Sequence, residues 1–94
     1  MIAFLTLEIR IEAAHSLKDK RHVVRSVKDR LRTNFNVAVS ELDHNDLWQR
    51  AEIGVCQIGN DRAFVDSALR QVANFIDALA LAPLGEETVE IINF

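Results

Sequence analysis

The first pattern along the chain has a period of two. From residue 2 to residue 12, every second position is apolar, at Ala3, Leu5, Leu7, Ile9 and Ile11. The intervening face begins with two apolar residues and then becomes polar: Ile2, Phe4, Thr6, Glu8 and Arg10. Strict alternation of this kind predicts a strand that buries one face and leaves the other open.

The next pattern has the period of a helix. Ser16 is a suitable helix N-cap, and Asp19 follows three residues later in the position of a capping box. Apolar residues then form one stripe, at Leu17, Val24, Val27, Leu31 and Phe35. Together these signals predict a helix that starts after Ser16, buries this stripe and ends near Asn34 and Asn36.

Two strands, a second helix and a last strand are predicted further along. A strand through residues 37–42 is followed by turn-forming residues at 43–46, and strand-like residues return from Ala51 to Ile58. The turn at residues 59–61 supplies an N-cap for a helix with the apolar face Phe64, Val65, Ala68, Leu69, Val72, Phe75, Ile76 and Leu79. Pro83 and Gly85 end this helix, and residues 88–94 form the last strand.

This order of elements defines the predicted fold class. It is α+β, a ferredoxin-like arrangement in which two helices cover one face of a four-stranded antiparallel sheet. With 94 residues, the chain is expected to form one domain, residues 1–94. The inward-facing residues of the third and fourth strands stay open, because a shift of one residue exchanges the two faces of a strand.

Composition indicates the cellular compartment of the protein. No apolar run approaches the roughly 20 residues that cross a bilayer, and the N-terminus lacks the basic start of a signal peptide. The single cysteine, Cys56, cannot form a disulfide within the chain. We therefore expect a cytoplasmic protein with no membrane partner.

The distribution of charge is the most informative feature. Seven of the 11 Lys and Arg residues, with only two Asp among them, lie between Lys18 and Arg32 and give this segment a net charge of +5. The rest of the chain has four basic and 12 acidic residues, a net charge of −8. Five cations, here called the basic stripe, are spaced three and four residues apart on one helix face: Lys18, Arg21, Arg25, Lys28 and Arg32.

Three interpretations of the basic stripe stay open. It binds the phosphates of RNA or another polyanion, supported by Lys20 and Arg30, because long cationic side chains grip phosphate groups. Alternatively, it is an ordinary solvated helix face. In the third interpretation, it meets acidic residues of a second copy of the chain.

Two further groups are candidates for contact with nucleic acid. At the helix start, His15, Ser16 and Lys18 suit one phosphate group, and the alternative is plain capping by Ser16. Trp48 is a candidate for stacking on a base, with Arg50 beside it on the RNA backbone. The alternative for Trp48 is packing over the end of a small core.

The turn segment and the cysteine are weaker candidates for chemistry. A metal site would use Asp43, His44 and Asp46, with His15 or His22. It is disfavoured because adjacent residues on an extended chain point to opposite faces. We therefore expect no metal and no cofactor. Cys56 is expected to be a buried, inert thiol within an apolar strand.

The open sheet face is the predicted dimer contact, through Ile2, Phe4, Ile58 and Phe94. The alternative is an exposed RNA platform, which is disfavoured because the paired aromatic residues of RNA-recognition sheets are missing.

The chain resembles a known family over nearly its whole length. The matching strings are HSLKDKR at residues 15–21, FNV at 35–37, DH at 43–44 and DLWQRAEIGV at 46–55. They resemble the YlxP-like family, small bacterial proteins of unknown function. The resemblance covers nearly the whole chain and implies a ferredoxin-like fold. It also implies a gene often placed among those for translation initiation and ribosome maturation, hence a ribosomal RNA partner, and it implies no catalytic residues.

The leading hypothesis is a non-enzymatic protein that binds RNA or associates with the ribosome through the basic stripe. Its rival is a homo-oligomeric module, a homodimer that pairs through the open sheet face without nucleic acid. A third hypothesis is a small enzyme that acts on an acyl phosphate. It is disfavoured because residues 13–15 lack the arginine and the glycines that such a site needs.

Overall fold

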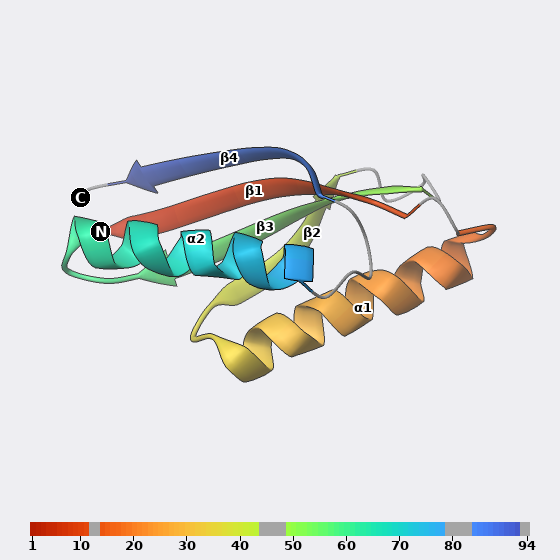
Figure 1. The fold of residues 1–94 in the computed structure, drawn as a ribbon, viewed down its shortest axis with the longest axis horizontal. Helices are drawn as coiled ribbons and strands as arrows, with labels where there is room; N and C mark the ends of the chain where they lie inside the picture. The colour runs from red at the N-terminus through yellow and green to blue at the C-terminus, as the bar shows by residue number, and fades with distance from the viewer. Residues whose placement is uncertain (12–13, 44–48, 79–83, 93–94) are drawn as a thin grey trace.

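An antiparallel sheet forms the centre of the protein. The computed structural model describes residues 1–11, 14–43, 49–78 and 84–92. Strand β1 (Ile2–Arg10) pairs with β3 (Arg50–Ile58), and β3 pairs on its other side with β2 (Ala38–Asp43) (Figure 1). In the structure, β4 (Leu84–Ile92) lies antiparallel along the other edge of β1, with Ile92 opposite Ile2.

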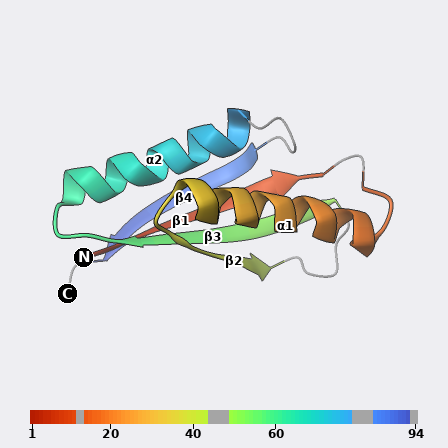
Figure 2. The same ribbon diagram turned by 90° about the horizontal axis from the view of Figure 1, so that it is seen from below.

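Both helices lie on the same face of this sheet, as Figure 1 and Figure 2 show from two sides. Helix α1 (Leu17–Asn34) follows β1 and packs chiefly over β2, whereas α2 (Arg62–Ala78) follows β3 and covers β1 and β3. The predicted α+β class is thus confirmed for the antiparallel order β1-β3-β2 with two helices. The complete ferredoxin-like arrangement, which needs β4 as its fourth strand, stays a prediction.

The core lies between the sheet and the helices, and the buried face of β1 is the one that its alternation predicts. All five predicted inward residues of the first strand region, from Ala3 to Ile11, are buried. The open question about β3 is answered by Ala51, Ile53 and Val55, which are fully buried. The odd-numbered residues of β1 and β3 therefore face the helices, and the even-numbered residues face away.

Two predictions about buried residues were wrong. Phe64 was expected on the core face of α2, but it is 60% exposed, and the buried stripe of α2 includes Ala73 instead. Cys56 was expected to be buried, but it is half-buried on the sheet face away from the helices. The cause is the register of β3, because Cys56 alternates with the inward-facing Val55 and pairs with Phe4.

Three of the predicted dimer residues, Ile2, Phe4 and Ile58, share the face of the sheet without helices. Ile2 and Phe4 are half-buried there, and Ile58, which pairs with Ile2, is 76% exposed. Phe94 lies outside the described residues. In the part of the chain that the structure describes, neither helix has the length and apolar character needed to cross a membrane.

Gly59 is a position where a side chain cannot be accommodated without a shift of its neighbours. A Cβ atom there would lie 2.5 Å from Cγ1 of the fully buried Val65. We expect Gly59→Ala to lower the free energy of unfolding by about 1–3 kcal/mol, because the tight packing around Val65 must shift. The measurement is urea unfolding of the purified variant.

Gly54→Ala is the matched comparison. The added Cβ would lie 2.8 Å from Leu42, but Leu42 is 44% exposed and its side chain can turn outward. We expect a smaller loss of stability than for Gly59→Ala. Equal losses in the two variants would contradict the assignment of the Gly59 effect to its rigid neighbour.

Candidate nucleic-acid interface

The start of α1 is fixed by side-chain capping, as the sequence predicted. Ser16 Oγ accepts a hydrogen bond from the Asp19 backbone N–H at 3.1 Å. Asp19 Oδ2 in turn accepts one from the His15 N–H at 3.0 Å. The reciprocal bond of the capping box thus reaches the residue before the N-cap rather than the N-cap itself. These bonds orient the first turn, on which Lys18 is exposed.

The same bonds bear on the phosphate group predicted at His15, Ser16 and Lys18. Two of the N–H groups that would hold a phosphate are already bonded to side chains, and the Asp19 carboxylate adds a negative charge. This arrangement is unfavourable for an anion at the helix start. The phosphate site there stays a prediction, and the capping alternative is confirmed.

Lys20 was predicted to support the basic stripe, but it belongs to the core. Its side chain is 2% exposed and lies on the buried face of α1 with Val24, Val27 and Leu31. Its Nζ lies 3.0 Å from Oε2 of Glu41, a residue of β2. Lys20 therefore serves the packing of α1 on β2 and is not available to an external phosphate.

The Lys20–Glu41 contact compensates a buried charge. Glu41 Oε2 is buried, and the Lys20 ammonium 3.0 Å away brings a positive charge that balances this carboxylate. Glu41 faces α1 because its position on β2 pairs with the inward-facing Ile53. The spacing of Lys20 with the apolar stripe, and of Glu41 with Val37 and Val39, was the sequence signal for this pair.

The basic stripe itself lies on the surface of α1. Lys28 is half-buried and the other four residues are exposed. Within the described ranges, the ion pairs are Glu8–Arg10, Lys20–Glu41 and Asp66–Arg70, and none of them involves the stripe. The positive charge of the stripe is therefore not neutralised by ion pairs with the acidic side chains that the structure describes.

Two features give the stripe a defined shape. At its C-terminal end, the Arg32 guanidinium donates a hydrogen bond of 3.1 Å to the Val39 carbonyl, which ties this side of α1 to β2. At its N-terminal end, Lys18, Arg21 and Arg25 surround a shallow hollow of about 250 Å³ together with His22. From the sequence, His22 was named only as a possible metal ligand and was not grouped with the stripe, although it lies four residues after Lys18 and three before Arg25 on the same helix face.

The other candidates lie apart from the stripe or outside the described residues. Arg50 is exposed at the start of β3 and pairs with Arg10 on the sheet face away from α1. It therefore does not extend the stripe. Trp48, His44 and Asp46 lie outside the described residues. Among the residues that are described, no three His, Cys, Asp or Glu side chains are grouped as for a metal ion.

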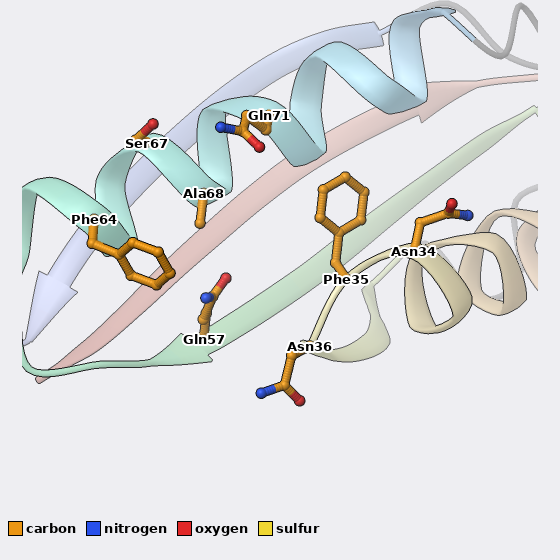
Figure 3. A pocket seen from close by; sticks show the side chains of 8 residues that line it. All are labelled: Asn34, Phe35, Asn36, Gln57, Phe64, Ser67, Ala68 and Gln71. Atoms are coloured by element: carbon orange, nitrogen blue, oxygen red, sulfur yellow. The ribbon is translucent and has the colours of Figure 1, made fainter.

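A second hollow, of about 300 Å³, lies where the end of α1 approaches β3 and α2 (Figure 3). Its lining includes the side chains of Asn34, Phe35, Gln57, Phe64 and Gln71. The sequence interpretation did not group them, because they come from three elements that are far apart in the chain. An exposed phenylalanine on a helix was the available signal, and it was read as part of the core.

The fold and its surface define a class of protein: a small α+β domain with a cationic helix on the outside. The chain belongs to the family described as "Protein of unknown function (DUF503)", whose model matches residues 2–87. It is also 37% identical over 78 residues to the "Uncharacterized protein YlxP" of Bacillus subtilis (strain 168), which covers 83% of this chain and 85% of that protein. The resemblance to the YlxP-like family is thereby confirmed.

Proposed function

We propose that this protein is a non-enzymatic, cytoplasmic RNA-binding protein that holds RNA phosphates along the basic stripe. The observation that carries the proposal is the hollow formed by Lys18, Arg21, His22 and Arg25 on a face without ion pairs among the described residues. Because these side chains form no ion pairs with the described residues, no such pair has to be broken when they bind an external anion. Arg side chains can also hold a phosphate through two parallel hydrogen bonds.

The length of the stripe suits a polymer better than a single ion. From Lys18 to Arg32 it extends about 21 Å along the helix axis at 1.5 Å per residue. Several phosphates of one strand can be contacted over this length, and each contact releases a counterion. Ribosomal RNA is the partner to test first, because the sequence resemblance implies it.

The test is fluorescence anisotropy with labelled ribosomal RNA fragments over a series of salt concentrations. We expect the logarithm of the binding constant to fall with the logarithm of the salt concentration, with a slope of about −2 to −4. Such a slope corresponds to roughly three to five phosphate contacts on a single strand. Absence of binding even at low salt would contradict the proposal.

A second candidate function, a homodimer formed through the open sheet face, rests on a different observation. Ile58 is 76% exposed and Leu42 is 44% exposed on this face. Leu42 also borders a largely apolar hollow of about 140 Å³ with Phe4 and Cys56. Sedimentation at low and high salt tests this function. A dimer held by apolar contacts persists as salt rises, whereas one held by the stripe dissociates.

We further infer that β4 completes a ferredoxin-like sheet. The support is its antiparallel register with β1, in which Thr88 pairs with Thr6 and Ile92 with Ile2. A fourth strand would cover the edge of β1, which would otherwise present unpaired backbone groups. Amide hydrogen exchange in residues 88–92 tests this inference. Slow exchange supports the strand, and exchange as fast as in an unfolded peptide contradicts it.

A further inference from the structure

The hollow at the end of α1 combines aromatic and amide groups without a charged side chain. Two phenyl rings, of Phe35 and Phe64, line it together with the carboxamides of Asn34, Asn36, Gln57 and Gln71. Its volume of about 300 Å³ is at the lower end of the range for small-molecule sites, which suits a single ring system. Lys and Arg, which dominate the nearby stripe, are absent from this lining.

The two phenyl rings differ in how firmly they are held. The Phe35 ring packs edge-on against Phe75, with a centroid distance of 5.3 Å and an interplanar angle of 83°. The Phe64 ring is 60% exposed at the border of the hollow. Figure 3 shows the two rings on either side of Ala68, with the Gln57 side chain rising from β3 between them. One ring is thus anchored in the structure, and the other is available to stack on a flat ligand.

Three of the four carboxamides supply hydrogen-bonding groups that the described residues leave unused. The Asn34 amide nitrogen donates to the Arg30 carbonyl at 2.8 Å. In contrast, the side chains of Asn36, Gln57 and Gln71 form no hydrogen bond with other described residues. Each carboxamide offers both a donor and an acceptor. A flat, uncharged ring with donors and acceptors along its edge matches this set, and a nucleobase is such a ring.

We propose that this hollow binds one unstacked base of single-stranded RNA, with Phe64 stacking on the base and the carboxamides of Gln57 and Gln71 contacting its edge. The inference rests on the proposed function, because it requires RNA as the partner. Arg30 is exposed one helical turn before Asn34 and can hold the phosphate of the bound nucleotide. The hollow lies on the α2 side of α1 and Arg32 on the β2 side, so a strand that contacts both crosses the end of α1.

The test compares two labelled probes of equal length by fluorescence anisotropy. One is a single-stranded RNA of about 12 nucleotides of mixed sequence. The other has the same ribose-phosphate backbone without bases. The basic stripe is expected to bind both, whereas the hollow distinguishes them. Because stacking of one base on an aromatic ring contributes about 1–3 kcal/mol, the intact strand should bind about 5- to 150-fold more tightly.

Substitutions at exposed positions assign this difference to the hollow. Phe64→Ala should remove most of the preference for the intact strand, and Phe64→Trp should retain it, because an indole also stacks. Gln71→Ala should weaken the preference. The matched controls are Ile58→Ala, which removes an exposed apolar residue elsewhere, and Asn74→Ala, which removes an exposed amide of α2 outside the hollow. Circular dichroism verifies that each variant is folded.

The outcomes separate this inference from the proposed function. Equal affinity for the two probes overturns the base site but leaves phosphate binding by the stripe intact. A preference for bases that survives Phe64→Ala, or that is lost equally in Ile58→Ala, also overturns it. If neither probe binds, the proposed function fails and the base site fails with it. A further arm adds free adenosine monophosphate, and tighter binding of this nucleotide than of the strand would assign the hollow to free nucleotides and overturn RNA as the source of the base.

Discussion

Lys20→Ala is expected to lower the free energy of unfolding by about 3 kcal/mol. The substitution leaves Glu41 with a buried carboxylate oxygen and without the ammonium group that lies 3.0 Å away. Removal of one partner of a buried ion pair typically costs about 3–5 kcal/mol, and the remaining exposure of Glu41, at 22%, places the expected loss at the lower end. Urea unfolding followed by circular dichroism measures the change.

The control for this substitution is Lys18→Ala. Lys18 lies on the same helix two residues earlier but is exposed, and it should change stability by less than about 0.5 kcal/mol. The double variant Lys20→Met with Glu41→Leu replaces both charges by apolar side chains and should recover most of the loss. An effect of Lys20→Ala no larger than that of Lys18→Ala would show that the ion pair does not hold α1 on β2.

The Lys20 variants also separate stability from RNA binding. Because Lys20 is buried, the Lys20→Met and Glu41→Leu double variant should bind RNA like the unaltered protein. The original sequence hypothesis, in which Lys20 supports phosphate binding, expects the opposite. The same anisotropy measurement as for the proposed function distinguishes the two expectations.

Charge reversal in the basic stripe is expected to have the largest effect on binding. The double variant Arg21→Glu with Arg25→Glu should weaken RNA binding by about 100-fold at low salt, because two phosphate contacts are replaced by repulsion. The slope of binding against salt should become shallower by about 1.4, since each single-strand contact contributes about 0.7. Both residues are exposed, so the fold should remain intact.

The matched control moves the same change in net charge to the other helix. Arg62→Glu with Arg70→Glu alters two exposed arginines of α2, outside the stripe. A general effect of net charge would weaken binding similarly in both double variants, whereas a local interface is sensitive only to the stripe. Equal losses in the two variants would therefore overturn the stripe as the binding surface.

The sequence by itself determined the features that depend on neighbours within one element. The alternation from Ala3 to Ile11 predicted the buried face of β1 because successive residues of a strand point to opposite sides. Ser16 predicted the start of α1 because an N-cap acts on the N–H groups of the next few residues. The sequence also predicted the basic stripe, because the spacing of its residues follows the helical period.

Only the tertiary structure decided which residues of different elements meet. Lys20 carries the same charge as the residues of the stripe, and its partner Glu41 lies 21 positions away, so the pair appears only when α1 docks on β2. Phe64 has the hydrophobicity of a core residue, and only the packing of α2 on the sheet leaves its ring exposed. The hollow beside Phe35 and Gln57 likewise exists only after two helices and a strand have come together. Periodicity describes the faces of an element, whereas the partner of each face depends on the shapes and charges that the other elements bring to it.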